Sequence, residues 1–178
     1  MLHSKKVGTL PVKGNDKEKQ TNEIKMAIPL LDAIDIGGKT ITADALLTQR
    51  DFARYLVKKK QANYLFIVKG NQKTLLEDIE FHFAHQKSDP DYEMTDGIAH
   101  GRIETRKIWV STDLNAYLKF PYVGQSFMIQ RDCHDKKSAK NSSEVVYGIT
   151  SLSPDQANPE KVLQTSRGHW VIENSCHY

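Results

Sequence analysis

The sequence has few cysteines and no long apolar stretch, and each shortage removes a class of protein. Two cysteines among 178 residues are too few for a disulfide framework, so we expect reduced thiols and a cytoplasmic protein. No apolar run is long enough to cross a membrane, and residues 1–8 lack the apolar core of a secretory signal. The net charge of +3 is well short of the strong basic excess that by itself indicates nucleic-acid binding.

Several catalytic and cofactor motifs are also absent. The sequence contains no Gly-rich phosphate loop, no Gly-x-Ser-x-Gly turn and no dinucleotide fingerprint. His82 and His85 lie three residues apart, and two Cys-His pairs occur further on, so a zinc site is an alternative to consider. No spacing among them matches a structural zinc site. Lone surface histidines are the simpler interpretation.

Apolar periodicity predicts alternating strands and helices in the first half of the chain. Residues 39–45 and 64–68 are expected strands, and the second is apolar enough to be buried on both faces. Residues 49–60 between them have helical spacing. A strand, a helix and a strand in this order predict a parallel βαβ unit. Short helical patterns near residues 30–34 and 75–83 flank it.

The second half has the pattern of antiparallel strands followed by a helix. Strands are expected at residues 101–110, 127–131 and 144–152. The polar tract of residues 132–143 is expected to be a mobile hairpin tip. Asn158, followed by Pro159 and an acid, predicts a helix start, and this last helix should continue past Trp170.

Two acids stand out by their positions. Asp44 closes a predicted strand, and open α/β sheets bind their ligands outside the carboxyl ends of strands. Glu173 lies on the last helix, with His169 four residues earlier on the same face. Each acid also has an ordinary explanation, as a solvated turn residue or as part of a wet helix face. Spacing alone leaves both interpretations open.

Five blocks of residues resemble one known family. In chain order they are Asn22-Glu23-Ile24 with Ala27-Ile28-Pro29, Thr42-Ala43-Asp44-Ala45 with Gln49, Lys69-Gly70-Asn71-Gln72, His100-Gly101-Arg102-Ile103-Glu104-Thr105-Arg106, and His169-Trp170-Val171-Ile172-Glu173-Asn174. Together they cover nearly all of the chain. They resemble the DDE-type insertion-sequence transposases, and most closely the H-repeat-associated group.

The resemblance implies an α/β fold: an RNase H-like mixed sheet flanked by helices, with a mostly antiparallel β insertion before the last helix. Residues 1–87 would form the core without its first strand, residues 88–152 the insertion, and residues 153–178 the truncated catalytic helix. The implied activity is DNA strand cleavage and strand transfer at transposon ends by two-metal in-line phosphoryl transfer. The implied partner is double-stranded DNA at the terminal repeats, and the implied cofactor is Mg²⁺ or Mn²⁺.

The resemblance also assigns roles to single residues. Asp44 corresponds to the second acid of the family's metal-binding triad and Glu173 to the third, so both are expected to be catalytic and to bind metal. Expected DNA contacts are Lys69, Arg102, Arg106, His169 and Asn174. For Arg102 and Arg106 the ordinary alternative to DNA contact is a surface ladder of ion pairs with Glu104, since these three side chains share a strand face.

The sequence departs from the family at two places. Ser166 and His169 stand where the wider class has the Tyr and Arg of a Tyr-Arg-Glu-Lys signature, and its Lys would fall beyond Tyr178. The family's first acid lies on an upstream strand, and neither Asp16 nor Asp35 follows a buried apolar strand. We therefore expect a chain that is truncated at both ends and catalytically incomplete.

Two alternatives to an active enzyme fragment stay open. One is a noncatalytic DNA-binding remnant that occupies transposon ends or modulates an intact transposase. The other is a fragment that binds nothing. Apolar surface exposed where the first strand is missing predicts either self-association, with a homo-oligomer as the partner state, or poor solubility.

Overall fold

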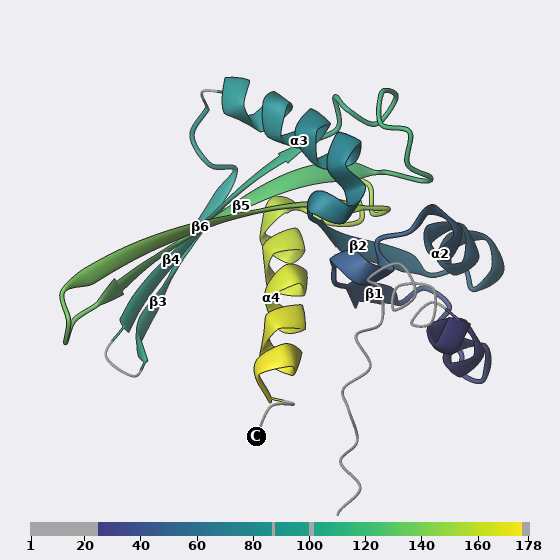
Figure 1. Ribbon diagram of the computed structural model, residues 1–178, viewed down its shortest axis with the longest axis horizontal. Helices are drawn as coiled ribbons and strands as arrows, with labels where there is room; N and C mark the ends of the chain where they lie inside the picture. The colour runs from purple at the N-terminus through teal and green to yellow at the C-terminus, as the bar shows by residue number, and fades with distance from the viewer. Residues whose placement is uncertain (1–24, 87, 100–101, 176–178) are drawn as a thin grey trace, which may run out of the picture.

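The computed structural model describes residues 25–86, 88–99 and 102–175, with the backbone alone for residues 97–99 and 169–175 (Figure 1). Its strands form one mixed six-stranded sheet in the order β1-β2-β6-β5-β4-β3. Their bounds are β1 Thr40–Ala43, β2 Asn63–Val68, β3 Tyr92–Ala99, β4 Arg102–Ser111, β5 Gln125–Asp135 and β6 Lys140–Thr150. β1 and β2 pair in parallel, and every other neighbouring pair is antiparallel.

The helices connect and cover these strands. Residues 25–32 are helical, α2 spans Arg50–Arg54 and continues as a π-helical turn over Tyr55–Lys59, α3 spans Lys73–His85, and α4 spans Pro159–Ser175. Short 3-10 turns over Ala45–Leu47 and Gly70–Gln72 follow β1 and β2. Within the described residues, no helix has both the length and the apolar character needed to cross a membrane.

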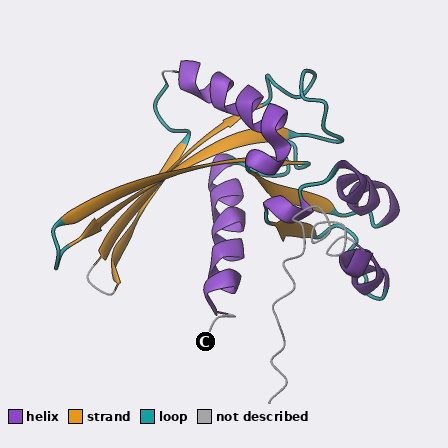
Figure 2. Cartoon of the chain, viewed as in Figure 1, coloured by secondary structure: helices purple, strands orange, loops and turns teal. Residues whose placement is uncertain are grey.

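Helices cover both faces of the sheet (Figure 2). Alternate residues of β2 explain why, since Tyr64 and Phe66 pack in a core with α2 and α3, whereas Leu65 and Ile67 pack in a second core with α4. Val162 and Leu163 are among the fully buried residues that α4 contributes. The expectation of an α/β fold with a mixed sheet between helices is confirmed.

The long strands β3 to β6 extend beyond the helices as a twisted arm, seen at the left of Figure 1. Here the structure corrects the expectation of a mobile hairpin tip over residues 132–143. β5 continues to Asp135 and β6 begins at Lys140, and these two residues still pair. The tract is polar because no helix covers this outer end of the arm (Figure 1), and its backbone hydrogen bonds form the ladder regardless of side-chain polarity.

Candidate functional site

Asp44 lies where the sequence predicts it, directly after the carboxyl end of β1. It caps the 3-10 turn over Ala45–Leu47, and its Oδ1 accepts a hydrogen bond of 3.0 Å from the Leu46 N–H. The side chain is half-buried. Its Oδ2 makes no hydrogen bond with the residues that the structure describes. One carboxylate oxygen therefore fixes the turn.

The loop that carries Asp44 is fastened to the exit of the neighbouring parallel strand. Buried Thr48 places its hydroxyl 2.7 Å from the carbonyl oxygen of Ile67 and 3.1 Å from that of Asp44. Asn71 donates its side-chain amide to the carbonyl of Ala45. Since β1 and β2 are parallel, their exit loops meet at one edge of the sheet, and these hydrogen bonds join the two loops.

Gln72 adds another hydrogen bond between the two loops, because its Nε2 donates to the carbonyl oxygen of Thr48 at 2.9 Å. We call Thr48, Asn71 and Gln72 together the clamp. Gln49, Asn71 and Gln72 belong to the blocks that carry the family resemblance, but the sequence alone gives them no role. Their position after two strands that are expected to be parallel is the one sequence signal that could have indicated a shared structural role. The structure shows that they hold the Asp44 loop.

Lys69 follows β2 at the same edge of the sheet as Asp44, as the sequence predicts. It precedes the 3-10 turn over Gly70–Gln72, and its side chain is exposed. Among the described residues it forms no ion pair within 4 Å. Its charge is therefore available to an anion near Asp44.

Glu173 lies on α4, and the backbone of α4 packs against β1, β3 and β4. The helix that carries the second expected acid thus contacts the strand that carries the first. The side chains of His169, Glu173 and Asn174 lie outside the described part of the structure, so convergence of the two carboxylates stays a prediction.

The two arginines of β4 differ sharply in their surroundings. Arg102 is exposed and pairs with Asp135 at 3.3 Å, whereas the Arg106 side chain is only 8% exposed and lies between the carboxylates of Asp96 and Glu104. Of the surface ladder weighed as the ordinary alternative, only the Glu104–Arg106 pair forms, and it is buried, whereas Arg102 pairs with Asp135 instead. The expectation that the Arg106 guanidinium contacts DNA does not fit this burial, since its two Nη atoms are paired with Asp96 and Glu104. Its Nε is buried without a hydrogen-bond partner among the described residues.

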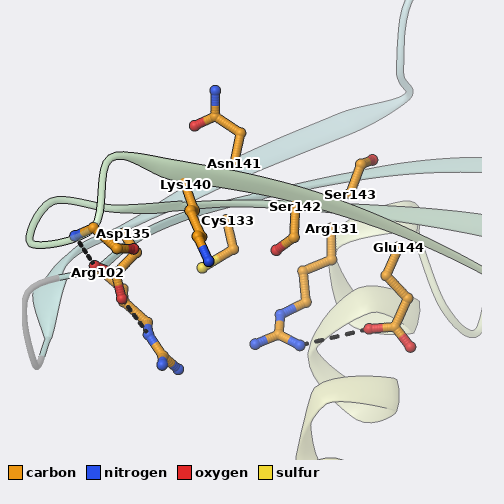
Figure 3. Close-up of a pocket in the computed structure, with 10 residues that line it drawn as sticks. Arg102, Arg131, Cys133, Asp135, Lys140, Asn141, Ser142, Ser143 and Glu144 are labelled. Atoms are coloured by element: carbon orange, nitrogen blue, oxygen red, sulfur yellow. Dashed lines mark hydrogen bonds and ion pairs between the residues drawn. The ribbon is translucent and has the colours of Figure 1, made fainter.

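Arg106 is the centre of an ion network on the face of the sheet that α4 covers. Arg131 of β5 donates to Glu104 at 2.7 Å and lies 3.6 Å from Glu144, as Figure 3 shows for the second pair. The hydrogen bond from Arg131 is the largest influence that lowers the pKa of Glu104. Burial raises this pKa, and the nearby charge of Arg106 lowers it further. The network keeps Glu104 ionised inside the arm.

The same network reaches α4. Arg167 of α4 pairs with Asp96 of β3 at 2.8 Å, and Asp96 also pairs with Arg106. Arg167 is six positions before Glu173, which corresponds to about 9 Å along a helix. Sequence reasoning missed this link, because Asp96 belongs to a strand that the sequence pattern did not predict. The ion network positions the helix that carries Glu173.

Of the two expected metal ligands, the structure describes the side chain of Asp44 but not that of Glu173. No three His, Cys, Asp or Glu side chains of the described residues gather around one point. Cys133 is a free thiol, as expected, and takes part in no such group. Asp44 does suit a hard cation, because it is half-buried and has one carboxylate oxygen without a partner in the described structure.

The fold and this edge define an α/β domain that presents a carboxylate, side-chain amides and a lysine at the carboxyl ends of its parallel strands. The model of the family described as the transposase DDE domain matches residues 11–178. The chain belongs to this family.

Relatives of the chain carry names of the same kind. It is 34% identical over 173 residues to "Putative transposase YncI" and 29% identical over 189 residues to "H repeat-associated putative transposase YhhI", both from Escherichia coli. These matches cover 90% and 99% of this chain but 42% and 47% of the relatives. The chain therefore spans a little less than half the length of these two relatives.

One solved structure of low similarity also matches. It is a piggyBac transposase synaptic complex with hairpin DNA, with a TM-score of 0.38 and 15% sequence identity. The match covers 93% of this chain and 29% of that chain.

Proposed function

We propose that this chain is part of a DNA transposase and supplies two acids for strand cleavage and strand transfer at transposon ends. The observation that carries the proposal is the placement of Asp44. Its carboxylate stands at the carboxyl edge of the sheet in a loop held by Thr48, Asn71 and Gln72. The strand that precedes it packs against α4, which carries Glu173.

Asp44 and Glu173 are the residues that would hold Mg²⁺ or Mn²⁺. Two such ions supply activation of the attacking hydroxyl and stabilisation of the leaving oxygen in an in-line displacement at phosphorus. The protein's part is to fix the Asp44 carboxylate. Its Oδ1 accepts the Leu46 N–H and so forms the turn. The clamp holds the loop against the end of β2.

Lys69 and Arg102 are the proposed contacts to DNA phosphates, because both side chains are exposed cations. His169 and Asn174 are proposed to contact DNA beside Glu173 on α4. Arg106 is left out of this set, because its charge is paired within the arm.

The division of the chain belongs to the same proposal. Residues 1–87 and 153–178 would form an RNase H-like core, and residues 88–152 the β insertion, whose strands β3 to β6 continue the sheet of the core. No residue of this chain is assigned to the family's first acid, so the chain alone is proposed to be catalytically incomplete. A noncatalytic DNA-binding role is the second candidate, since the exposed cations Lys69 and Arg102 would serve it without a metal site.

Manganese-dependent nicking of supercoiled DNA by the purified chain tests these proposals, with Mn²⁺ binding measured in parallel. The Asp44→Asn variant removes the proposed ligand. Asp155→Asn is the matched control, because it makes the same change at an exposed loop residue before α4.

We expect Asp44→Asn, but not Asp155→Asn, to lose Mn²⁺ binding. Nicking that disappears only in Asp44→Asn would show that the chain completes a working metal site by itself. DNA binding without nicking by any of the proteins would favour the noncatalytic role. If the wild-type chain binds neither Mn²⁺ nor DNA at low salt, the proposed function is wrong.

A further inference from the structure

A cavity of about 520 Å³ opens beside the loop that follows Asp44. Three parts of the chain line it: the start of α2, the first turns of α3 with the 3-10 turn before it, and the segment between β4 and β5. Its charged lining side chains are Arg50, Lys73, Asp78 and Lys119, and its aromatic ones are Tyr117 and Phe120. None of these residues is assigned a role by the sequence pattern.

Positive charge dominates this cavity, with three cations against one carboxylate. Arg50 and Lys119 form no ion pair within 4 Å among the described residues, and Lys73 is paired only with Glu77, at 3.7 Å and with both side chains exposed. Such an exposed pair holds its partners weakly. The carboxylate of Asp78 is 3.4 Å from the Tyr117 hydroxyl.

The cavity in the β arm has fewer unpaired cations among its described residues. It measures about 570 Å³, and Figure 3 shows two of its arginines paired with carboxylates that line the same cavity. Its charges are largely matched internally. The cavity at α3 is therefore the better place for an anion.

Backbone groups add to this preference. The first turn of α3 contains no acid, and Gln72, which precedes the helix, makes no capping hydrogen bond with its side chain. The positive end of the α3 dipole thus faces the cavity, and Asp78 is the one carboxylate of the described residues that lines it.

The cavity is joined to the Asp44 loop through two of its lining residues. Asn71 hydrogen-bonds to the carbonyl of Ala45, and Gln72 to the carbonyl of Thr48. An anion bound in the cavity would therefore contact the same residues, Asn71 and Gln72, that hold the Asp44 loop.

We propose that this cavity binds phosphate groups of the DNA strand that runs to Asp44. The inference rests on the proposed function, since it assumes that DNA is the substrate. It assigns Arg50, Lys73 and Lys119 as the residues that hold the backbone, and it places exposed Tyr117 against the same strand.

The test compares two double variants of the full chain that lose equal charge. Arg50→Gln/Lys119→Gln removes two cations of the cavity. Lys39→Gln/Lys59→Gln removes two exposed cations near the amino ends of β1 and β2, away from the edge that carries Asp44. Fluorescence anisotropy with a labelled duplex between about 50 and 200 mM salt gives the affinity and its salt dependence.

We expect the cavity variant to bind DNA on the order of tenfold more weakly at low salt, with a logarithmic salt slope shallower by about 2. The control variant should stay close to the wild type. Lys73 and Lys119 should also be protected from acetylation by DNA, as measured by mass spectrometry, whereas Lys39 should not.

Equal affinities and slopes for the two variants, with normal binding by the wild type, would overturn the cavity assignment and leave the proposed function standing. Absence of binding by the wild type would overturn both proposals.

Discussion

Replacing Arg106 with Gln separates a structural role from a DNA-binding one. The substitution removes a guanidinium whose side chain is 8% exposed and which pairs with Asp96 and Glu104. Breaking a buried pair from one side costs about 3 to 5 kcal/mol. The lower end applies, because both carboxylates are partly exposed and each keeps a second arginine, Arg167 or Arg131.

A loss of about 3 kcal/mol corresponds to a fall in Tm of about 6 to 12 °C for a domain of this size. Urea unfolding followed by circular dichroism measures the free energy, and DNA titrations of the folded variant measure the salt slope. We expect the slope of Arg106→Gln to match that of the wild type.

Arg102→Gln is the comparison, because Arg102 is on the same strand face and its side chain is 59% exposed. Its unfolding free energy should change by less than about 1 kcal/mol, and its salt slope should become shallower by about 1. If Arg106→Gln keeps its stability and loses salt slope instead, the ion network is not what holds the arm, and the reasoning is refuted.

Three further outcomes follow from the same structure. Thr48→Val should lower the free energy of unfolding by about 1 to 2 kcal/mol and weaken Mn²⁺ binding about tenfold, as urea titration and electron paramagnetic resonance of free Mn²⁺ would show; unchanged affinity would mean that the clamp does not position Asp44. Gly148→Ala should destabilise the protein by about 1 to 3 kcal/mol, because the added Cβ would overlap the Phe127 ring; unfolding at the wild-type midpoint would contradict this packing. The lowered pKa of Glu104 stabilises the fold above the pKa of an unfolded glutamate, so this contribution should disappear as the pH falls through the lowered value, and Glu104→Gln should flatten the acid limb of a stability curve.

Local periodicity predicts the helical layer and the parallel strands well. The apolar run of β2 is buried on both faces, and α4 begins at Pro159 as its capping pattern indicates. These elements carry their burial pattern in consecutive residues, so one window of sequence is enough to recognise them.

The arm was harder to predict. β3 contains Asp96 and Gly97, which weaken a strand pattern, and it is defined by pairing with β4. The burial of Arg106 follows from that pairing, because Asp96 reaches it from the neighbouring strand. Such contacts depend on register, which no single stretch of sequence displays.

In the candidate site, too, some features can be predicted from one stretch of sequence and others depend on contacts between distant residues. The position of Asp44 at a strand end can be read from the sequence, but the clamp of Thr48, Asn71 and Gln72 requires two loops to meet in space. The cations of the cavity come from three separate parts of the chain, so their gathering is a property of the fold.

The edge position of β1 has a consequence for how the site can be completed. Within the described residues, β1 pairs with β2 alone, so its other edge presents backbone donors and acceptors to any added strand. A strand docking there in parallel would end beside Asp44 and bring its own terminal side chains to the same place. If Asp44 holds a metal ion as proposed, strand addition at this edge would be the step that brings further ligands to it.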